Sequence, residues 1–294
     1  MKLINVTKSL VLTGVAAALA ACSPATQNSV QSGTQSTGII GGQPVDTKDS
    51  IAKTTVAIIA SVKTADDQEG QFICTGSLLK HNMVLTAGHC VPQVGEEYKE
   101  VSLYVIFNTD INKMQRTDIR LVVDSEVHED YGKIGQDGED ASDVAVLRFA
   151  GGMAPGYQIA KFLSDESLLV PGTKVTLAGY GLIETDGVNT KSDDRLRKVD
   201  VEIADSFGKT EMLLDQTQGK GACHGDSGGP AFLEVNGVQY VWGITSRGAG
   251  KDGKDDCSLV AVYTKVKSQA TFINKAIKTL SKREQQQQRL AQQQ

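Results

Sequence analysis

Short runs of apolar or alternating residues recur along the chain from residue 39 onward, and turn-forming residues separate them. In residues 198–204, Val199, Val201 and Ile203 alternate with polar residues, which is the period of a strand with one buried face. Many such runs, together with 30 glycines, favour an all-β barrel or sandwich. The other runs that predict strands span residues 55–62, 71–79, 83–86, 101–107, 121–123, 144–149, 175–178, 238–244 and 260–266.

The C-terminal part of the chain follows a helical period instead. Ser268 is a candidate N-cap, and the apolar residues after it fall on one face of a helix that we expect to span residues 268–280. Residues 281–294 continue into a run of glutamines and predict a disordered tail. The apolar face of the helix consists of Phe272, Ile273, Ala276, Ile277 and Leu280.

The N-terminus carries the features of an export signal. Lys2 and Lys8 accompany an apolar run, residues 10–19, that is too short to span a bilayer. The run ends in Leu19-Ala20-Ala21-Cys22, which resembles the bacterial lipobox. This resemblance implies a lipoprotein signal peptide at residues 1–21 and acylation of Cys22 as the mature N-terminus. The alternative is an ordinary cleavage site that happens to precede a cysteine.

The next stretch and the cysteine count fit that reading. Residues 23–38 carry no charged side chain and few apolar side chains that could form a core. We therefore expect residues 22–38 to form a lipidated tether or propeptide. Export implies an oxidising compartment, where an odd thiol among five cysteines needs an explanation. A lipid on Cys22 leaves four cysteines, which can form two disulfides in any of three pairings. These four are Cys74, Cys90, Cys223 and Cys257.

Composition narrows the possible partners. The formal net charge is -5 and no basic run is present, which argues against binding of nucleic acid. Once the signal and tail are set aside, about 240 residues remain, enough for one large domain or two small ones with a substantial core.

The segment Gly225-Asp226-Ser227-Gly228-Gly229-Pro230 is the sharpest chemical signal in the chain. Glycines around a serine permit a backbone turn that other residues resist, and such a turn exposes the hydroxyl and points successive amides at one spot. That arrangement suits a nucleophile with an oxyanion hole. The alternative is a glycine-rich surface turn.

A serine nucleophile needs a base, and the base needs an orienting carboxylate. Of the four histidines, His89 ends an apolar run, His224 lies in the loop of Ser227 as a rim residue, and His81 and His128 have polar neighbours. Asp143 precedes the apolar residues 144–147. A carboxylate at the edge of a buried strand is costly without a partner, although simple solvation at the strand edge is the alternative.

These residues stand in motifs that resemble those of the trypsin/chymotrypsin family. Thr86-Ala87-Gly88-His89-Cys90, Asp143-Val144-Ala145-Val146-Leu147 and Gly225-Asp226-Ser227-Gly228-Gly229-Pro230 are similar to its three triad motifs and occur in its order. Ile39-Ile40-Gly41-Gly42 resembles its mature N-terminus, and Ala261-Val262-Tyr263-Thr264-Lys265-Val266 resembles its C-terminal end. The resemblance runs from Ile39 to about Leu280.

The resemblance implies a serine endopeptidase that acts on proteins or peptides without a cofactor or metal. Ser227 would attack the substrate, His89 would act as base, Asp143 would orient it, and the amides of Gly225 and Ser227 would form the oxyanion hole. The implied fold has two six-stranded antiparallel β-barrels, about residues 39–155 and 156–267, within a protease domain of residues 39–280 that ends in an α-helix. The implied disulfides are Cys74–Cys90 and Cys223–Cys257.

The same resemblance implies a zymogen. Cleavage between Gly38 and Ile39 would create an amine that pairs with Asp226, which otherwise is a buried, unpaired charge. Gly38 departs from the basic residue usual at this position, and no Lys or Arg lies between Cys22 and Ile39. The activating protease is therefore expected to differ from trypsin in specificity and stays unidentified. Cleavage there would also release the enzyme from its lipid.

By alignment with the family, Gly221 forms the floor of the primary pocket and Gly248 and Ala261 its walls, with His224 and Ser246 beside them. None of these brings a negative charge, so we expect apolar side chains before the cut. Two departures bear on this expectation. Arg247 replaces an aromatic residue usual after Ser246, and the polar loop before Cys257 contains Asp255 and Asp256.

Other functions fit the residues less well. The esterase elbow also reads Gly-x-Ser-x-Gly, but it requires a histidine after the serine, and none follows Ser227. The acidic residues 136–140 lack the spacing of a calcium-binding EF-hand and predict a solvated loop. The non-enzyme alternative is a catalytically silent homologue that serves as a surface binding module, against which the complete triad argues.

Localisation follows from the lipobox. Ser23 after Cys22 is not the aspartate associated with inner-membrane retention, so the resemblance favours the outer membrane or periplasm of a Gram-negative bacterium. The protein is expected to be a monomer that contacts the membrane only through the lipid on Cys22.

Overall fold

The computed structural model describes residues 39–254 and 256–293. The expected signal peptide, the lipid site Cys22 and the tether of residues 22–38 lie outside the described residues. All described residues belong to one compact unit. Within it, no helix is both long and apolar enough to cross a membrane.

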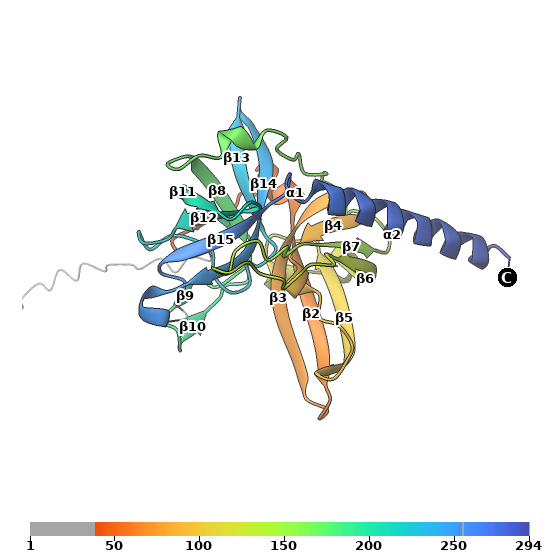
Figure 1. Cartoon of the computed structure of the whole chain (residues 1–294). Helices are drawn as coiled ribbons and strands as arrows, with labels where there is room; N and C mark the ends of the chain where they lie inside the picture. Colours follow the sequence, from red (N-terminus) through yellow and green to blue (C-terminus); the bar gives the residue numbers. More distant parts are fainter. Residues whose placement is uncertain (1–38, 255, 294) are drawn as a thin grey trace, which may run out of the picture. The chain divides into compact units, whose positions relative to one another are not determined.

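The first half of the unit is a closed antiparallel barrel (Figure 1). Its strands follow one another around the barrel in the order β2-β3-β4-β7-β6-β5. Apolar side chains from these strands fill the interior and form one large buried cluster. The strands are β2 (Thr55–Thr64), β3 (Glu69–Lys80), β4 (Met83–Thr86), β5 (Tyr98–Ile106), β6 (Ile119–Val127) and β7 (Ala145–Phe149).

The second half is another six-stranded antiparallel barrel, closed because β8 pairs with both β11 and β13. The short strands β9 (Glu184–Thr185) and β10 (Thr190–Lys191) form a separate hairpin. Two closed barrels are therefore confirmed. The barrel strands are β8 (Lys174–Gly179), β11 (Arg197–Phe207), β12 (Glu211–Asp215), β13 (Pro230–Val235), β14 (Val238–Ala249) and β15 (Val260–Lys265).

All ten apolar or alternating runs lie in strands. In β11, Val199, Val201 and Ile203 are buried whereas Asp200 and Glu202 are exposed, as the alternation predicts. Strands β12 and β13 were not predicted. The first has only five residues, and the second begins at Pro230, which lacks the amide that a ladder requires and is tolerated at the first position of a strand.

Residues 39–44 belong with the second barrel and not with the first, where the boundary of residues 39–155 placed them, whereas Val45, Ile51 and Ala52 pack in the first barrel's cluster. Strand β1 (Gln43–Pro44) pairs with β11, and Ile39 is fully buried in the second barrel's apolar cluster. The main chain of Ile40 also forms a bridge with Gly221. Helix α1 (Ser50–Thr54) then leads into β2, with Asp49 capping its first turn. Single 3-10 turns span Gly88–Cys90, Ile111–Lys113, Arg116–Asp118, Glu166–Leu168 and Lys251–Gly253.

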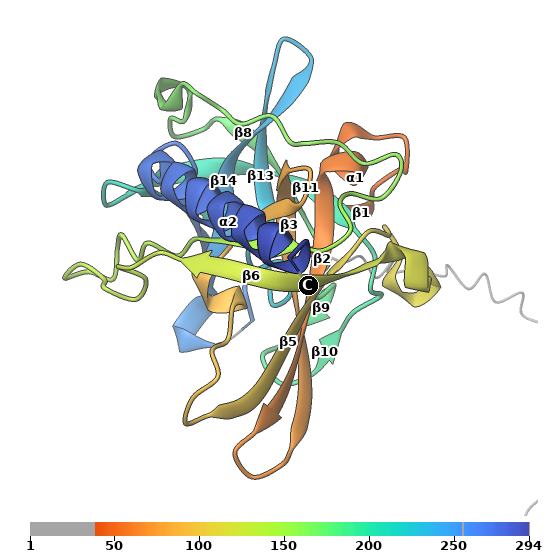
Figure 2. The same ribbon diagram turned by 90° about the vertical axis from the view of Figure 1, so that its right-hand side faces the viewer.

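The C-terminal helix α2 spans Ala270–Ala291, so the expected end at residue 280 and the disordered tail after it are wrong (Figure 2). Lys, Arg and Gln are good helix formers, and the added turns bind the first barrel. Asn82 donates to Glu284 at 2.9 Å, and Arg148 donates to Gln287 at 2.9 Å. Ser268 is not the N-cap, because its hydroxyl and amide bind Glu166 instead.

The apolar face of α2 is as predicted for four of its five residues. Phe272, Ile273, Ala276 and Leu280 are buried, and Ile277 packs partly buried against the first barrel's cluster.

Candidate active site

Strand pairing brings His89 and Asp143 together. Strand β4 ends at Thr86, which lies opposite Ala145 at the start of β7. His89 follows β4 on the Gly88–Cys90 turn, and Asp143 precedes β7, so the antiparallel register places them at the same end of the barrel. The Cys74–Cys90 disulfide ties this turn to β3.

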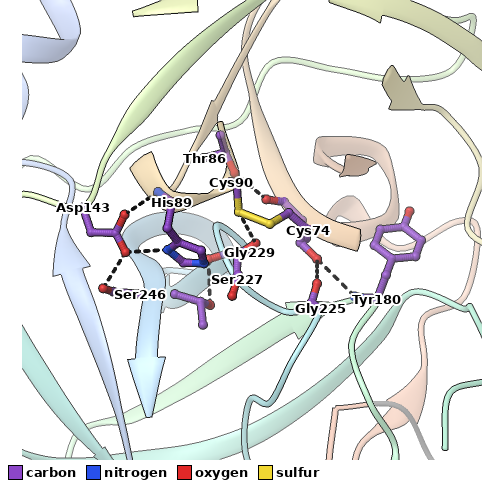
Figure 3. Close-up of a disulfide and its surroundings, with 12 residues drawn as sticks. Cys74, Thr86, His89, Cys90, Asp143, Tyr180, Gly225, Ser227, Gly229 and Ser246 are labelled. Atoms are coloured by element: carbon purple, nitrogen blue, oxygen red, sulfur yellow. Dashed lines mark hydrogen bonds and ion pairs between the residues drawn. A yellow bond between two sulfur atoms is a disulfide. The ribbon is translucent and has the colours of Figure 1, made fainter. Parts of the chain in front are cut away.

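Asp143 forms two hydrogen bonds with His89, one with the imidazole ring and one with the backbone amide. The His89 Nδ1 lies 2.8 Å from Asp143 Oδ2, and the His89 backbone amide donates to Oδ1 at 3.0 Å (Figure 3). The Ser246 hydroxyl donates to Oδ2 at 2.7 Å. Asp143 is only 3% exposed. Burial opposes its ionisation, but the hydrogen bonds from His89 and Ser246 outweigh burial and hold the pKa of Asp143 below its usual value.

The Ser227 loop is anchored to the first barrel. Thr75 on β3 donates two hydrogen bonds to this loop. Its amide donates to the Ser227 carbonyl at 2.8 Å, and its hydroxyl donates to the Gly225 carbonyl at 3.0 Å. Gly228 has φ +77°, and a Cβ there would lie 2.0 Å from the Thr86 hydroxyl. Only glycine fits this close approach between the two barrels.

The amides of Gly225 and Ser227 are positioned for an acceptor outside the chain. The His224 carbonyl accepts from Leu182, and the Asp226 carbonyl accepts from Gly229. Because a trans peptide points its N–H opposite to its C=O, the Gly225 and Ser227 amides point the other way. Within the described residues, neither amide donates to a protein acceptor.

A cavity of about 610 Å³ joins these groups. His89, Asp143 and Ser227 line it, and so do four of the five predicted substrate-binding residues. Gly221 is not among the lining residues, although the next residue, Ala222, is, and its place at the pocket floor stays a prediction. The Cys223–Cys257 disulfide forms part of the wall. The predicted residues at the cavity are His224, Ser246, Gly248 and Ala261.

The loop between β6 and β7 supplies lining residues that the sequence did not predict, among them Tyr131, Ile134 and Gly138. The fully buried Glu211 of the second barrel holds this loop by accepting from the amides of Asp140 and Ala141. Glu211 also binds Arg247 through both carboxylate oxygens, each at 2.8 Å. A signal for Glu211 exists in the sequence, because it precedes an apolar run just as Asp143 does.

The acidic residues 136–140 were expected to form a solvated loop, and the structure corrects this for Asp140. Its carboxylate accepts from the amides of Lys209 and Thr210 and from the Thr210 hydroxyl. These bonds dock the loop on the second barrel, because a short carboxylate can satisfy successive amides of a turn.

Asp226 is buried, and no cationic side chain among the described residues pairs with it. It is 0% exposed, and its carboxylate accepts from the Gly181 amide at 2.8 Å and the Cys223 amide at 2.9 Å. Burial raises its pKa to about 7 in spite of these two bonds. The side chain of Ile39 is also fully buried, in the cluster of the same barrel.

Two clusters of described residues have the spacing of metal ligands: Cys74, His89 and Cys90, and Cys223, His224 and Cys257. In each cluster the two sulfurs are joined in a disulfide. They therefore offer no thiolate for a metal ion.

Comparison with known proteins agrees with this geometry. The model of the Trypsin family matches residues 39–273, so the chain belongs to this family and is a serine-type endopeptidase. It is 28% identical over 232 residues to the venom peptide isomerase heavy chain of Agelenopsis aperta, covering 71% of this chain and 90% of that protein.

Two further similarities support the assignment. The chain is 32% identical over 191 residues to brachyurin of Leptuca pugilator, covering 62% of this chain and 78% of brachyurin. A solved structure of HL collagenase superposes with a TM-score of 0.61 at 19% identity, covering 81% of this chain and 97% of the other, which shows a common fold.

Proposed function

We propose that the protein is an exported endopeptidase that cleaves peptide bonds through Ser227, His89 and Asp143, and that it is made as a zymogen. The observation that carries this proposal is the paired contact of Asp143 with the Nδ1 and backbone amide of His89, at 2.8 and 3.0 Å, beside Ser227 in one cavity.

Each residue has a defined part in the proposed reaction. Asp143 accepts a hydrogen bond from the Nδ1–H of His89 and stays ionised, which leaves Nε2 to take the proton of the Ser227 hydroxyl. Ser227 Oγ attacks the carbonyl carbon, and the resulting oxyanion is bound by the Gly225 and Ser227 amides. His89 then protonates the leaving amine, and water hydrolyses the acyl-enzyme by the same route in reverse. Removal of one such amide donor costs roughly 3–4 kcal/mol of transition-state stabilisation.

The cavity favours apolar side chains before the cut. Among the described residues that line it, the only carboxylate is Asp143, which His89 and Ser246 already engage. Asp256 accepts from Ser258 within its own loop and does not line the cavity, whereas Asp255 lies outside the described residues. A cationic side chain would thus find no free counter-charge there.

Activation is proposed to follow cleavage between Gly38 and Ile39. The new amine of Ile39 would supply a positive charge to the buried Asp226, which has no cationic partner among the described residues. That ion pair would neutralise the buried carboxylate beside Ser227 and so stabilise the loop that carries the Gly225 and Ser227 amides. The relatives include a venom protein, consistent with export. Anchoring by a lipid on Cys22 and release on activation remain part of this proposal.

Hydrolysis of short peptides tests the function. We expect a chain beginning at Ile39 to cleave a substrate with Phe or Leu before the cut at least tenfold faster than one with Arg. Ser227→Ala is the matched control and should cleave neither. If the Ile39 chain is folded but inactive on a broad peptide mixture, the binding-module alternative replaces the protease.

A further inference from the structure

Arg247 and Glu211 form a fixed unit beside the catalytic residues. The two terminal nitrogens of Arg247 donate to the two carboxylate oxygens of Glu211, each at 2.8 Å. Glu211 is 0% exposed and also accepts from the amides of Asp140 and Ala141. A bidentate pair with every carboxylate oxygen satisfied is a rigid geometry, because rotation of either side chain would break two bonds at once.

The same guanidinium continues toward the active site. Its Nη1 donates to the Ser246 hydroxyl oxygen at 3.1 Å, and Nη2 donates to the Gly138 carbonyl at 2.6 Å. The Ser246 hydroxyl in turn donates to Asp143 Oδ2. Glu211, Arg247, Ser246, Asp143 and His89 therefore form one continuous chain of hydrogen bonds across the two barrels.

This series of hydrogen bonds fixes the direction in which the Ser246 hydroxyl proton points. A hydroxyl has one proton, and a guanidinium can only donate. Because Arg247 fills an acceptor site on the Ser246 oxygen, the Ser246 proton cannot turn toward it and is left for Asp143 Oδ2. The same oxygen faces His89 Nδ1, so the orientation of Ser246 bears directly on how Asp143 holds the imidazole.

A substrate-binding role for Arg247 fits less well. Its four terminal N–H groups have four acceptors: the two oxygens of Glu211, the Ser246 hydroxyl and the Gly138 carbonyl. The neighbouring Glu211 also raises the pKa of Arg247 above its usual value, so the pair stays ionised. An acidic substrate side chain could therefore reach only the Nε–H of Arg247 without displacing one of these bonds.

We propose that Arg247, held by Glu211, is a positioning residue that acts through the Ser246 hydroxyl to fix Asp143 and His89 in the reactive geometry. This inference rests on the proposed function of the same site. It assigns a role to a charged residue that stands where related proteases are expected to carry an aromatic one.

The test compares Arg247→Lys with Arg148→Lys as a matched control. Lysine at position 247 keeps the positive charge, but its single amine cannot reproduce the paired hydrogen bonds of the guanidinium to Glu211 and Ser246. Arg148 is a buried arginine that binds Gln287 and Asp124 below helix α2, outside the cavity. For each folded protein beginning at Ile39, the rate of labelling by a small fluorophosphonate, kcat, KM and the melting temperature are measured. The small probe reports on the reactivity of Ser227 without occupying remote subsites.

We expect Arg247→Lys to lower kcat and the labelling rate by about tenfold with KM changed by less than about twofold, and Arg148→Lys to leave all three near the parent values. In a Ser246→Ala background, the effect of Arg247→Lys on labelling should shrink to less than about twofold, because the connecting hydroxyl is gone.

Three results would overturn the inference: unchanged labelling in Arg247→Lys, an equal loss in Arg148→Lys, or the same loss with and without the Ser246 hydroxyl. A failure of the proposed function is distinguishable from these, because then the parent protein itself would not be labelled at all.

Discussion

The side chain of Gln216 occupies the space in front of Gly221. A Cβ on Gly221 would lie 2.0 Å from Gln216 Oε1, and Gly221 has φ +155°. Gln216 is held in place because its Oε1 accepts from the Ala222 amide at 2.6 Å, and its Nε2 donates to the Ala222 and Cys257 carbonyls. A side chain at position 221 would therefore meet a glutamine whose hydrogen bonds are satisfied within the protein.

This arrangement predicts that specificity for Arg cannot be installed at Gly221. Gly221→Asp would force the Gln216 side chain out of a fully hydrogen-bonded site, so we expect a loss of roughly 2–4 kcal/mol in the free energy of unfolding. Urea denaturation measures that loss, and Arg- and Phe-type substrates measure the preference. A stable variant that cleaves after Arg would contradict the placement of Gln216.

The intact chain should lose stability as pH rises through the range in which Asp226 ionises. Its pKa is about 7 in the folded intact chain, against a usual 3.8, so the folded state binds more protons than the unfolded state between these values. The contribution of Asp226 to the free energy of unfolding is therefore fully present below pH 3.8, and it falls by about 4 kcal/mol as pH rises through 7.

Urea denaturation at pH 4.5 and 7.5 checks the Asp226 prediction. Asp226→Asn removes the titrating group, so the intact variant should lack this part of the pH dependence. A chain beginning at Ile39 should lack it too, because its amine balances the charge. Equal pH dependence in all three proteins would disprove the prediction.

Asp143→Asn should lower kcat/KM by about 10⁴-fold with little change in KM. The amide would offer an N–H where His89 Nδ1 or the Ser246 hydroxyl now donates, so the imidazole would take the wrong tautomer. Because the pKa of Asp143 is held below its usual value, its contribution is present above pH 3.8 and is lost only as pH falls through the lowered value. Steady-state kinetics between pH 5 and 9 check this, and a loss below tenfold would count against the proposed role.

Ending the chain after Leu280 should destabilise the first barrel. Arg148 is 4% exposed and would lose its bond to Gln287 and its contact with Glu284 at 3.9 Å, leaving a buried cation less well paired. We expect a loss of about 1–3 kcal/mol in the free energy of unfolding. Removal of Gln292–Gln294 alone is the control, and equal melting temperatures for both truncations would refute the role of the added turns.

Local patterns predicted most of the fold. The strand positions followed from alternation, and the order of His89, Asp143 and Ser227 identified the family whose fold places them together. The long helix was missed because the glutamine-rich composition says nothing about Asn82 and Arg148, the distant partners that make residues 281–291 fold against the barrel.

Pocket details were harder to predict for the same physical reason. The sequence motif predicted Gly221 at the pocket, but the pattern gives no sign that the Gln216 side chain, five positions earlier, fills the space a side chain at 221 would need. Likewise, Arg247 was recognised as unusual, whereas its partner Glu211 lies far from it in sequence and emerges only from the pairing of β12, β15 and β14.

Covalent labelling by a fluorophosphonate shows whether Ser227 is an activated nucleophile and whether cleavage before Ile39 is needed for it. The full chain and a chain beginning at Ile39 are each labelled beside their Ser227→Ala variants, and the modified residue is located by mass spectrometry. The account predicts labelling of Ser227 in the Ile39 chain and none in the full chain or in either variant. Labelling of neither parent chain would contradict the protease, and equal labelling of both would contradict activation by cleavage.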